Sequence, residues 1–398
     1  MRWKGLTHGE RTLLDHVFWA SAISRDGLAE AAAFSKSRSN AAVAELLEQG
    51  LLESGGEPLA TGGRRAETLR LSRELGVLIG VAVGATGLEV GVLSPDLSVL
   101  AHHSEPADVR HGPVPVLARI RELMRELLAR CGVPARQLIA IGIGLPGPVD
   151  VGSGQLVNPP LMPQWDAYSI REDIATDFRA PVFVDNDVNL MALGELWRLQ
   201  RGLPNFLVLK VGTGIGCGVV RHGQVYRGAN GSAGDVGHIC VVPEGPRCHC
   251  GNVGCVESVA AGPAIARLAT EAAEAGQSER LAQVLAERGA LRLQDVAEAS
   301  RAGDTAANQV IQRAGALVGQ MLASVVNFFN PSHVFIGGGI TRVGPLFLAA
   351  VRQSVYQRSL ALSTRHLEIQ YTPLGDRAGL IGAGVLAMQE SLRRLEAR

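Results

Sequence analysis

One short stretch, GHICVVPEGPRCHCGNVGCVES at positions 237–258, constrains this chain more than any other feature. It brings together His238, Cys248, Cys250 and Cys255, which are one imidazole and three thiols. Such a set fills the four positions of a tetrahedral zinc site, and glycines between the cysteines allow the loop to fold back on itself. Because no position is left for an activated water, the spacing predicts a structural zinc and not a catalytic one.

Two alternatives stay open for this stretch. The thiols can be buried without any metal, and His249 competes with His238 as the fourth ligand. His249 lies between two ligand cysteines, where its side chain tends to point away from a shared metal. The other three cysteines, at positions 131, 217 and 240, are interpreted as ordinary apolar core residues.

Composition limits the class of protein. The 398 residues are enough for two or three domains, and six cysteines are too few for a disulfide scaffold. Lys plus Arg and Asp plus Glu are both 38, so any surface for nucleic acid must be local. The start has no signal-peptide pattern, and apolar runs are interrupted by glycine or charge before they reach a membrane span. We therefore expect a cytoplasmic protein with no membrane partner.

Residues 1–74 have the pattern of a winged helix-turn-helix. Apolar spacing predicts three short helices before Gly50, and LLES (51–54) and TLRLS (68–72) predict two strands around a basic turn. The third helix of such a domain enters the major groove of DNA. Polar and basic side chains suited to phosphates and base edges occupy the start of that helix and the tip of the turn between the two strands. Those of the helix are Ser35, Lys36, Ser37, Arg38, Ser39 and Asn40, and those of the turn are Arg64 and Arg65. The alternative is a helical module for protein contacts with a solvated basic face.

The remaining residues, 75–398, alternate strands and amphipathic helices, which indicates an α/β fold with its site in the loops. The segment NFLVLKVGTGIGCGVV places Gly212, Thr213, Gly214 and Gly216 in a turn between two strands. Glycines there allow backbone N–H groups to approach a nucleotide phosphate, although they also occur in turns that bind nothing.

The motifs GSAGDVGHICV and CHCGNVGCVES, with IGIGLPGPVD, VDNDVNLMALGE, VGTGIGCGVV, NPSHVFIGGGI and LGDRAGLIGAG, resemble the ROK family of sugar kinases and sugar-responsive repressors over nearly the whole chain. The resemblance implies a two-lobed, actin-like (ribonuclease-H-like) ATPase-type domain over 75–398, preceded in the regulator branch by a winged helix. Its small lobe is expected over about 75–192 plus a C-terminal helix at 379–398, and its large lobe, with the zinc loop, over about 193–378.

The resemblance also implies a hexose site beside the zinc loop. Asn186 and Asp187 stand at the family's Asn-Asp pair, His238 at the histidine that contacts both sugar and zinc, and Glu257 at a further sugar-contacting glutamate. Asp235 stands where the family has a longer glutamate, so a different hydroxyl is expected to be bound. The segment NPPLMPQW departs from the family's sugar-gripping pattern, and no contact is carried over there.

The largest departure lies in GVAVGATGLEV, where the kinases have Asp-x-Gly-Gly-Thr. The aspartate position is Ala82, the second glycine is Ala85, and the cation position is Gly87. Phosphoryl transfer depends on positioning and neutralising the phosphates, and this chain lacks the carboxylate that anchors them. We therefore interpret residues 212–216 as a vestigial phosphate turn and expect no requirement for ATP or Mg²⁺.

Taken together, the sequence predicts a repressor that binds operator DNA as a homodimer or dimer of dimers and responds to a hexose or a derivative. The rival interpretation is an ATP-dependent hexose kinase in which Asp187 is the catalytic base. A third is a DNA-binding protein that no longer binds any ligand, which the retention of the sugar-binding residues opposes.

Overall fold

The structure is a computed structural model that describes residues 6–55 and 67–393. Two compact units divide the chain. The first unit contains the described parts of 1–158, 164–202 and 379–398, and the second contains 159–163 and 203–378. Among the described residues, no helix is long and apolar enough to cross a membrane.

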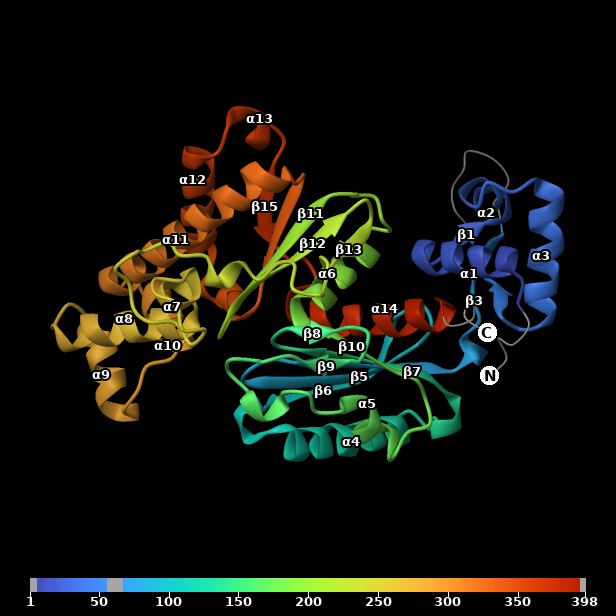
Figure 1. Cartoon of the computed structure of the whole chain (residues 1–398), viewed down its shortest axis with the longest axis horizontal. Coiled ribbons are helices and arrows are strands. Elements are labelled where there is room, and N and C mark those ends of the chain that lie inside the picture. The colour runs from blue at the N-terminus through green and yellow to red at the C-terminus, as the bar shows by residue number, and fades with distance from the viewer. Residues whose placement is uncertain (1–5, 56–66, 394–398) are drawn as a thin grey trace. The chain divides into compact units, whose positions relative to one another are not determined.

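The first unit begins with a domain of three helices and a small antiparallel sheet (Figure 1). Its elements are α1 (His8–Ala20), β1 (Ile23–Ser24), α2 (Arg25–Ala31), α3 (Lys36–Glu48), β2 (Leu52–Ser54) and β3 (Thr68–Leu71), with sheet order β1-β3-β2. Each helix starts at a hydroxyl cap, namely Thr7, Ser24 and Ser35. Three helices and two later strands are present as predicted, and the basic turn expected between β2 and β3 lies outside the described residues.

The rest of the first unit is built on a five-stranded mixed sheet of order β10-β7-β4-β5-β6. The strands are β4 (Val77–Val83), β5 (Gly87–Leu93), β6 (Val99–Pro106), β7 (Leu138–Leu145) and β10 (Val182–Asn186), and β8 (Val149–Asp150) pairs with β9 (Gln155–Leu156) in a separate ribbon. Helices α4 (Pro113–Arg130) and α5 (Ile170–Ala175) cover one face, and α6 (Asp187–Arg198) and α14 (Ala378–Arg393) cover the other (Figure 1). Strand β7 is buried at every residue, as its continuous apolar run predicts.

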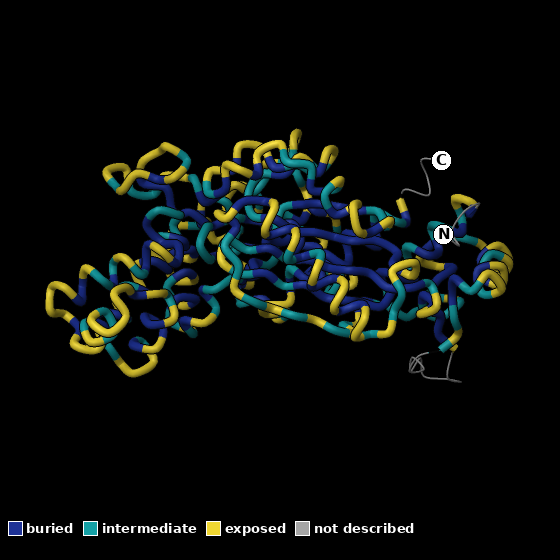
Figure 2. Tube along the Cα trace, turned by 90° about the horizontal axis from the view of Figure 1, so that it is seen from below, coloured by how far each residue is buried: buried dark blue, intermediate teal, exposed yellow. Residues whose placement is uncertain are grey.

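Glycines allow α14 to lie against the sheet and against α6. A Cβ added to Gly142 in β7 would lie 2.0 Å from the Ala383 carbonyl oxygen, and one added to Gly382 in α14 would lie 1.7 Å from the Leu190 carbonyl oxygen. These approaches are possible only without a side chain. Helices α6 and α14 are therefore in close backbone contact within the buried interior that Figure 2 shows.

The second unit has its own five-stranded sheet, of order β13-β12-β11-β14-β15. The strands are β11 (Phe206–Val211), β12 (Ile215–Arg221), β13 (Gln224–Tyr226), β14 (His333–Gly337) and β15 (Glu368–Tyr371). Helices α7 (Val256–Ala260), α8 (Gly262–Glu274), α9 (Glu279–Arg288), α10 (Leu293–Arg301), α11 (Thr305–Phe329), α12 (Pro345–Arg358) and α13 (Ala361–Thr364) complete the unit. The chain is thus a mixed α/β protein, as predicted.

Candidate functional site

The predicted metal ligands lie together in the second unit. His238 ends a short 3-10 turn, Cys255 is the residue before α7, and Cys248 and Cys250 lie in the loop between them. Their four donor atoms all lie within 4.8 Å of one another. The Cys250 and Cys255 Sγ atoms are 3.8 Å apart, and His238 Nδ1 is 3.5 Å from Cys248 Sγ.

These distances fit a tetrahedral metal site. Metal bonds of about 2.3 Å to sulfur and about 2.0–2.1 Å to nitrogen imply separations of about 3.8 Å between two sulfurs and about 3.6 Å between sulfur and nitrogen. Cysteine Sγ atoms 3.8 Å apart are too far for a disulfide and close for unligated thiols. The donor set can therefore hold a metal ion.

Backbone hydrogen bonds hold the loop in this form. The Val242 N–H donates to the Gly254 carbonyl at 3.2 Å, and the Cys248 N–H donates to the Asn252 carbonyl at 2.8 Å. Gly254 has a positive φ of 70°, and a Cβ there would lie 1.7 Å from the Val242 carbonyl oxygen, so the position requires glycine. Burial and the adjacent Cys250 raise the pKa of the Cys255 thiol to about 12.

The other cysteines and the rival histidine differ from the cluster in their exposure. His249 is exposed and does not belong to the cluster. The interpretation of the remaining cysteines as core residues is correct only for Cys217, because Cys131 is half-buried and Cys240 is exposed. Cys240 lies on the loop, and its backbone pairs with Cys255 in an isolated bridge.

His238 of the cluster and two carboxylates near it, Asp235 and Glu257, offer partners for hydroxyl groups. His238 directs Nδ1 to the cluster, and its Nε2 lies 3.7 Å from Asp235 Oδ1. Glu257 Oε2 accepts the Ile215 N–H at 2.9 Å, which connects α7 to the glycine turn between β11 and β12. Asp235 is exposed. Carboxylate acceptors next to an imidazole N–H match the alternating donors and acceptors of a polyol.

Asn186 and Asp187 lie in the first unit, at the start of α6. Asn186 caps this helix: its Oδ1 accepts the Val188 and Asn189 N–H groups at 2.9 and 3.4 Å, and its Nδ2 donates to the Gly147 carbonyl at 2.9 Å. One amide N–H of Asn186 remains for a ligand. Asp187 is the first helical residue, where the helix dipole favours a carboxylate.

Sequence reasoning missed Asp185, which is fully buried beneath this pair. Its Oδ1 accepts the Asn186 N–H at 2.7 Å and an Asn189 Nδ2–H at 3.0 Å. A buried carboxylate is stable only when it is hydrogen-bonded, so Asp185 fixes the backbone that carries the candidate sugar ligands. The signal was present as the first acidic residue of VDND, positions 184–187.

The two glycine-rich turns differ in what they offer a phosphate. In the turn between β11 and β12, the Gly212 N–H donates to the Gly214 carbonyl at 2.9 Å, and Gly216 lies within β12 opposite Lys210. Thr213 is half-buried at the tip. In the β4–β5 hairpin, Ala82 is half-buried and pairs with Glu89, so this position carries only a methyl group.

The residues predicted to bind DNA lie at the start of α3. Ser35 is its cap, Lys36 pairs with Asp26 at 2.8 Å, and Ser37 and Asn40 are exposed. Arg38 is exposed and lies over the Phe34 ring, 4.1 Å from its centroid.

Ser39 corrects the prediction, because it is only 1% exposed and faces the interior of the domain. It lies four residues before the buried Val43, so the two occupy the same face of α3. Arg64 and Arg65 lie outside the described residues.

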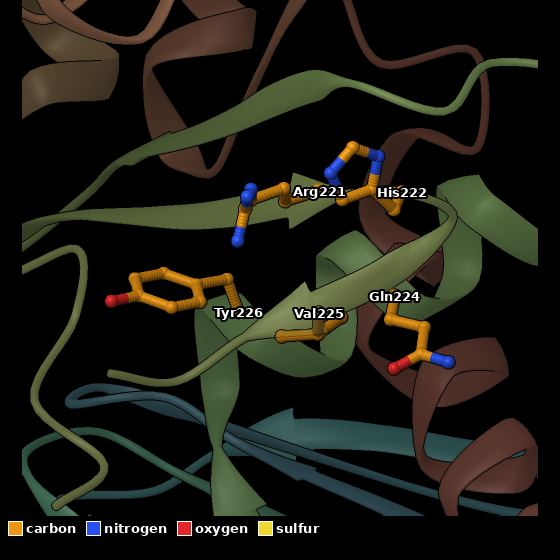
Figure 3. Close-up of a pocket in the computed structure, with 5 residues that line it drawn as sticks. All are labelled: Arg221, His222, Gln224, Val225 and Tyr226. Carbon is orange, nitrogen blue, oxygen red and sulfur yellow. The ribbon is translucent and has the colours of Figure 1, made fainter. Parts of the chain in front are cut away.

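A shallow hollow lies elsewhere in the second unit, on the β12–β13 hairpin (Figure 3). It is lined by Arg221, His222, Gln224, Val225 and Tyr226. None of these is a predicted site residue, and four of the five are exposed. The hollow has no buried polar group of the kind that orients a ligand, so it is not a candidate site.

Comparison with known proteins gives consistent matches. The sequence model of the ROK family matches residues 78–390. The chain is 32% identical over 314 residues to a glucokinase of Halalkalibacterium halodurans, covering 78% of this chain and 95% of the relative. It is 28% identical over 377 residues to the DNA-binding transcriptional dual regulator NagC of Escherichia coli K12, covering 93% of this chain and 89% of the relative. Among solved structures, a ROK family transcriptional regulator that is a homologue of the E. coli MLC protein superposes with a TM-score of 0.78 at 25% identity, covering 97% of this chain and 98% of that one.

Proposed function

The chain belongs to the ROK family, and on that premise we propose that it is a sugar-responsive, DNA-binding transcriptional regulator that acts as a repressor. The observation that carries the proposal is the domain formed by α1–α3 and β1–β3. The family model begins only at residue 78, and the glucokinase covers 78% of this chain. The two regulators cover 93% and 97%, which requires most of the N-terminal domain to align as well.

The effector of the proposed regulator is a hexose or a derivative. Within the second unit, Asp235, His238 and Glu257 are the proposed hydroxyl partners. Asn186 and Asp187 of the first unit are proposed as sugar ligands separately, because they stand at the Asn-Asp pair of the ROK family. Zinc is the proposed ion of the Cys₃His cluster, and its role there is to hold the loop that carries His238 and leads into α7. A ligand without hydroxyl groups would cover these donors and acceptors and leave them unpaired, so we expect the site to discriminate against it.

The proposed DNA contacts come from the first turn of α3. Lys36 and Arg38 neutralise phosphates, Ser37 and Asn40 reach base edges, and Ser35 holds the start of the helix. A homodimer, or a dimer of dimers, binds a palindromic operator, because one α3 helix reads one half-site. Residues 1–74 are the proposed DNA-binding domain and 75–398 the proposed effector domain.

The proposal holds that the effector domain does not transfer phosphate. Ala82 and Ala85 give the β4–β5 hairpin no carboxylate and less backbone freedom where a kinase positions Mg²⁺ and ATP. The second candidate function is an ATP-dependent hexose kinase. Asp187 at the start of α6, the glycine turn at 212–214 and the 32% identity to a glucokinase favour it.

The test begins with calorimetric titration of the zinc-loaded protein with D-glucose, D-xylose, N-acetyl-D-glucosamine and their phosphates, followed by an ATP-coupled phosphorylation assay. A DNA duplex is selected in parallel from a random pool. We expect one sugar to bind without turnover and one palindromic duplex to be enriched. Turnover at 1–10³ s⁻¹, the ordinary range of enzymes, would instead establish the kinase.

A pair of variants then tests the sugar residues. Glu257→Gln keeps an acceptor for the Ile215 N–H and removes only the charge, so we expect sugar affinity to fall about tenfold or more, as for other hydrogen bonds to a charged group. Glu271→Gln, on the exposed face of α8, is the matched control. Equal sugar affinity in the two variants contradicts the assignment of Glu257.

A further inference from the structure

Within the first unit, helix α6 runs from the candidate sugar ligands toward the proposed DNA-binding domain. It begins at Asn186 and Asp187, the candidate sugar ligands, and every residue from Val188 to Leu196 is buried. With a rise of about 1.5 Å per residue it spans about 18 Å. A buried helix of this length moves as a rigid body, so a displacement at its first turn reaches its last turn.

The chain beyond α6 makes an unusual turn. Gln200 and Arg201 follow one another with positive φ values of 49° and 59°. Two consecutive non-glycine residues in this region cost conformational free energy, which the surrounding contacts must offset. The Arg201 N–H donates to the Leu196 carbonyl at 3.1 Å, and the Gln200 Nε2 donates to the Ala20 carbonyl, the last residue of α1, at 3.2 Å.

Arg201 provides a second attachment to α1. Its guanidinium carbon lies 3.9 Å from the Trp19 ring centroid, and its Nη1 lies 3.2 Å from Asp15 Oδ2. The Trp19 Nε1 donates to the other Asp15 oxygen at 3.2 Å, so one carboxylate holds both groups. Trp19 is only 4% exposed, which makes the cation–π contact a partly desolvated and therefore stronger one.

Helix α1 in turn packs on the proposed recognition helix. Leu13, Leu14 and Val17 of α1 are fully buried, as are Val43 and Leu46 of α3. Close-packed side chains transmit displacement because they leave no space for independent movement. A shift of α1 therefore shifts α3.

The covalent connection between the two domains passes through Gly76. This residue has a φ of 124°, and an added Cβ would lie 2.0 Å from the Gln137 carbonyl oxygen. The connection thus passes close to the chain just before β7, and Arg73 beside it pairs with Asp96 at 3.3 Å. The contacts of Gln200 and Arg201 lie at a separate place on the DNA-binding domain, on α1. Two attachments at different places convert a movement of one into a rotation of the domain.

We propose that α6 transmits sugar occupancy at Asn186 and Asp187 to the DNA-binding domain, and that Arg201 is the positioning residue that couples them. This inference rests on the proposed function. A sugar hydroxyl that bonds to Asp187 acts on the first turn of α6, and the last turn then acts on α1 through Gln200 and Arg201. Neither Gln200 nor Arg201 contacts sugar or DNA in this scheme.

The experiment compares Arg201→Gln with the matched control Arg130→Gln, an exposed arginine at the end of α4 in the same unit. The sugar used is the member of the glucose, xylose and N-acetylglucosamine panel that binds the wild type most tightly, and the DNA is the duplex that the wild type selects. The dissociation constant for the duplex is measured with and without saturating sugar. In the wild type we expect these constants to differ by about fivefold or more, the usual range of allosteric coupling.

Arg201→Gln is expected to reduce this difference to about twofold or less, with sugar affinity in the absence of DNA unchanged, whereas Arg130→Gln keeps the wild-type difference. The reciprocal measurement, sugar affinity with and without the duplex, must lose the same factor, because coupling is a property of both ligands. A variant that was merely less stable would lose binding and not the ratio.

Each other outcome is decisive. If Arg201→Gln binds both ligands and keeps the wild-type ratio, the coupling role is wrong and the proposed function stands. If the variant no longer binds DNA, Asp15→Asn, which removes the ion pair and keeps an acceptor for the Trp19 N–H, is measured in its place, and an unchanged ratio there overturns the proposal. If the wild type binds no sugar of the panel or selects no duplex, the proposed function fails and the coupling fails with it.

Discussion

Removal of the metal from the loop between His238 and Cys255 is the sharpest test of the proposed zinc site. The perturbation is made in two ways, by a zinc chelator and by Cys250→Ser, which removes one of the four donors. Cys131→Ser is the matched control, because Cys131 is half-buried and lies outside the cluster.

The expected magnitude follows from the length of the closed loop. The segment from His238 to Cys255 contains about 18 residues, for which loop closure by one cross-link contributes about 3 kcal/mol to the free energy of unfolding. The second unit has about 180 residues, and in a unit of that size 1 kcal/mol shifts Tm by about 2–4 °C. Metal removal should therefore lower Tm by about 6–12 °C. Hydrogen bonds such as Val242 N–H to the Gly254 carbonyl still constrain the loop without metal. The upper end of this range is therefore the largest decrease in Tm that we expect.

The assay is differential scanning calorimetry of the protein as purified, after chelation, and after readdition of zinc, with metal content measured on the same samples. We expect the loss of Tm to be reversed by zinc and to be absent in Cys131→Ser. Sugar affinity should fall with the metal, because His238 lies on the loop, whereas binding to the selected duplex should persist. The reasoning is refuted if one equivalent of metal is removed with Tm unchanged within about 2 °C.

Three further outcomes are expected. The wild type should transfer no phosphate from ATP to the sugar it binds, and Ala82→Asp alone should not create turnover, because Ala85 still lacks the backbone freedom of glycine; a coupled assay that shows turnover in the wild type contradicts this. Arg38→Ala should weaken binding to the selected duplex and lower the salt slope by about one, with sugar affinity unchanged, and an unchanged salt slope contradicts the phosphate contact. Hydrogen bonds from the Arg119 guanidinium lower the pKa of Glu105 from 4.5 to about 2. The stabilisation by ionised Glu105 is therefore complete above pH 4.5 and is lost as the pH falls toward 2. In urea unfolding, Glu105→Gln should lower the free energy of unfolding at pH 7 and lower it less at pH 3, and equal effects at the two pH values would contradict the assignment.

The sequence was sufficient for most of the elements and for the metal cluster. A period of 3.6 reflects one-sided burial, which α4 shows, with Leu117, Ile120, Leu123 and Leu127 all buried. A continuous apolar run reflects burial on both faces, which β7 shows. The four donors were found because short spacing along the chain forces proximity in space. His238 groups with the three cysteines, whereas His249 is exposed on the turn that the Gly251 N–H closes to the Cys248 carbonyl.

The features that escaped prediction depend on contacts between distant segments. Ser39 was assigned to DNA because its neighbours are polar, yet the rotation of α3 against α1 places it inside. The pairing of Arg201 with Asp15 and Trp19 joins residues separated by more than 180 positions, and no local pattern marks it. The burial of Asp185 likewise depends on where β10 lies in the sheet.

In the proposed regulator, the candidate sugar ligand Asn186 also has a structural role in α6. Asn186 is both the cap of α6 and a candidate sugar ligand, and its amide already binds the Val188 N–H and the Gly147 carbonyl. A sugar that accepts the remaining Nδ2 N–H bonds to the same amide group that caps α6, so binding is coupled to the position of the first turn of α6. In an enzyme such coupling consumes binding free energy that could stabilise the transition state. In a regulator the same coupling is the output, because an effector shifts a conformational equilibrium only by the difference in its affinity for the two states.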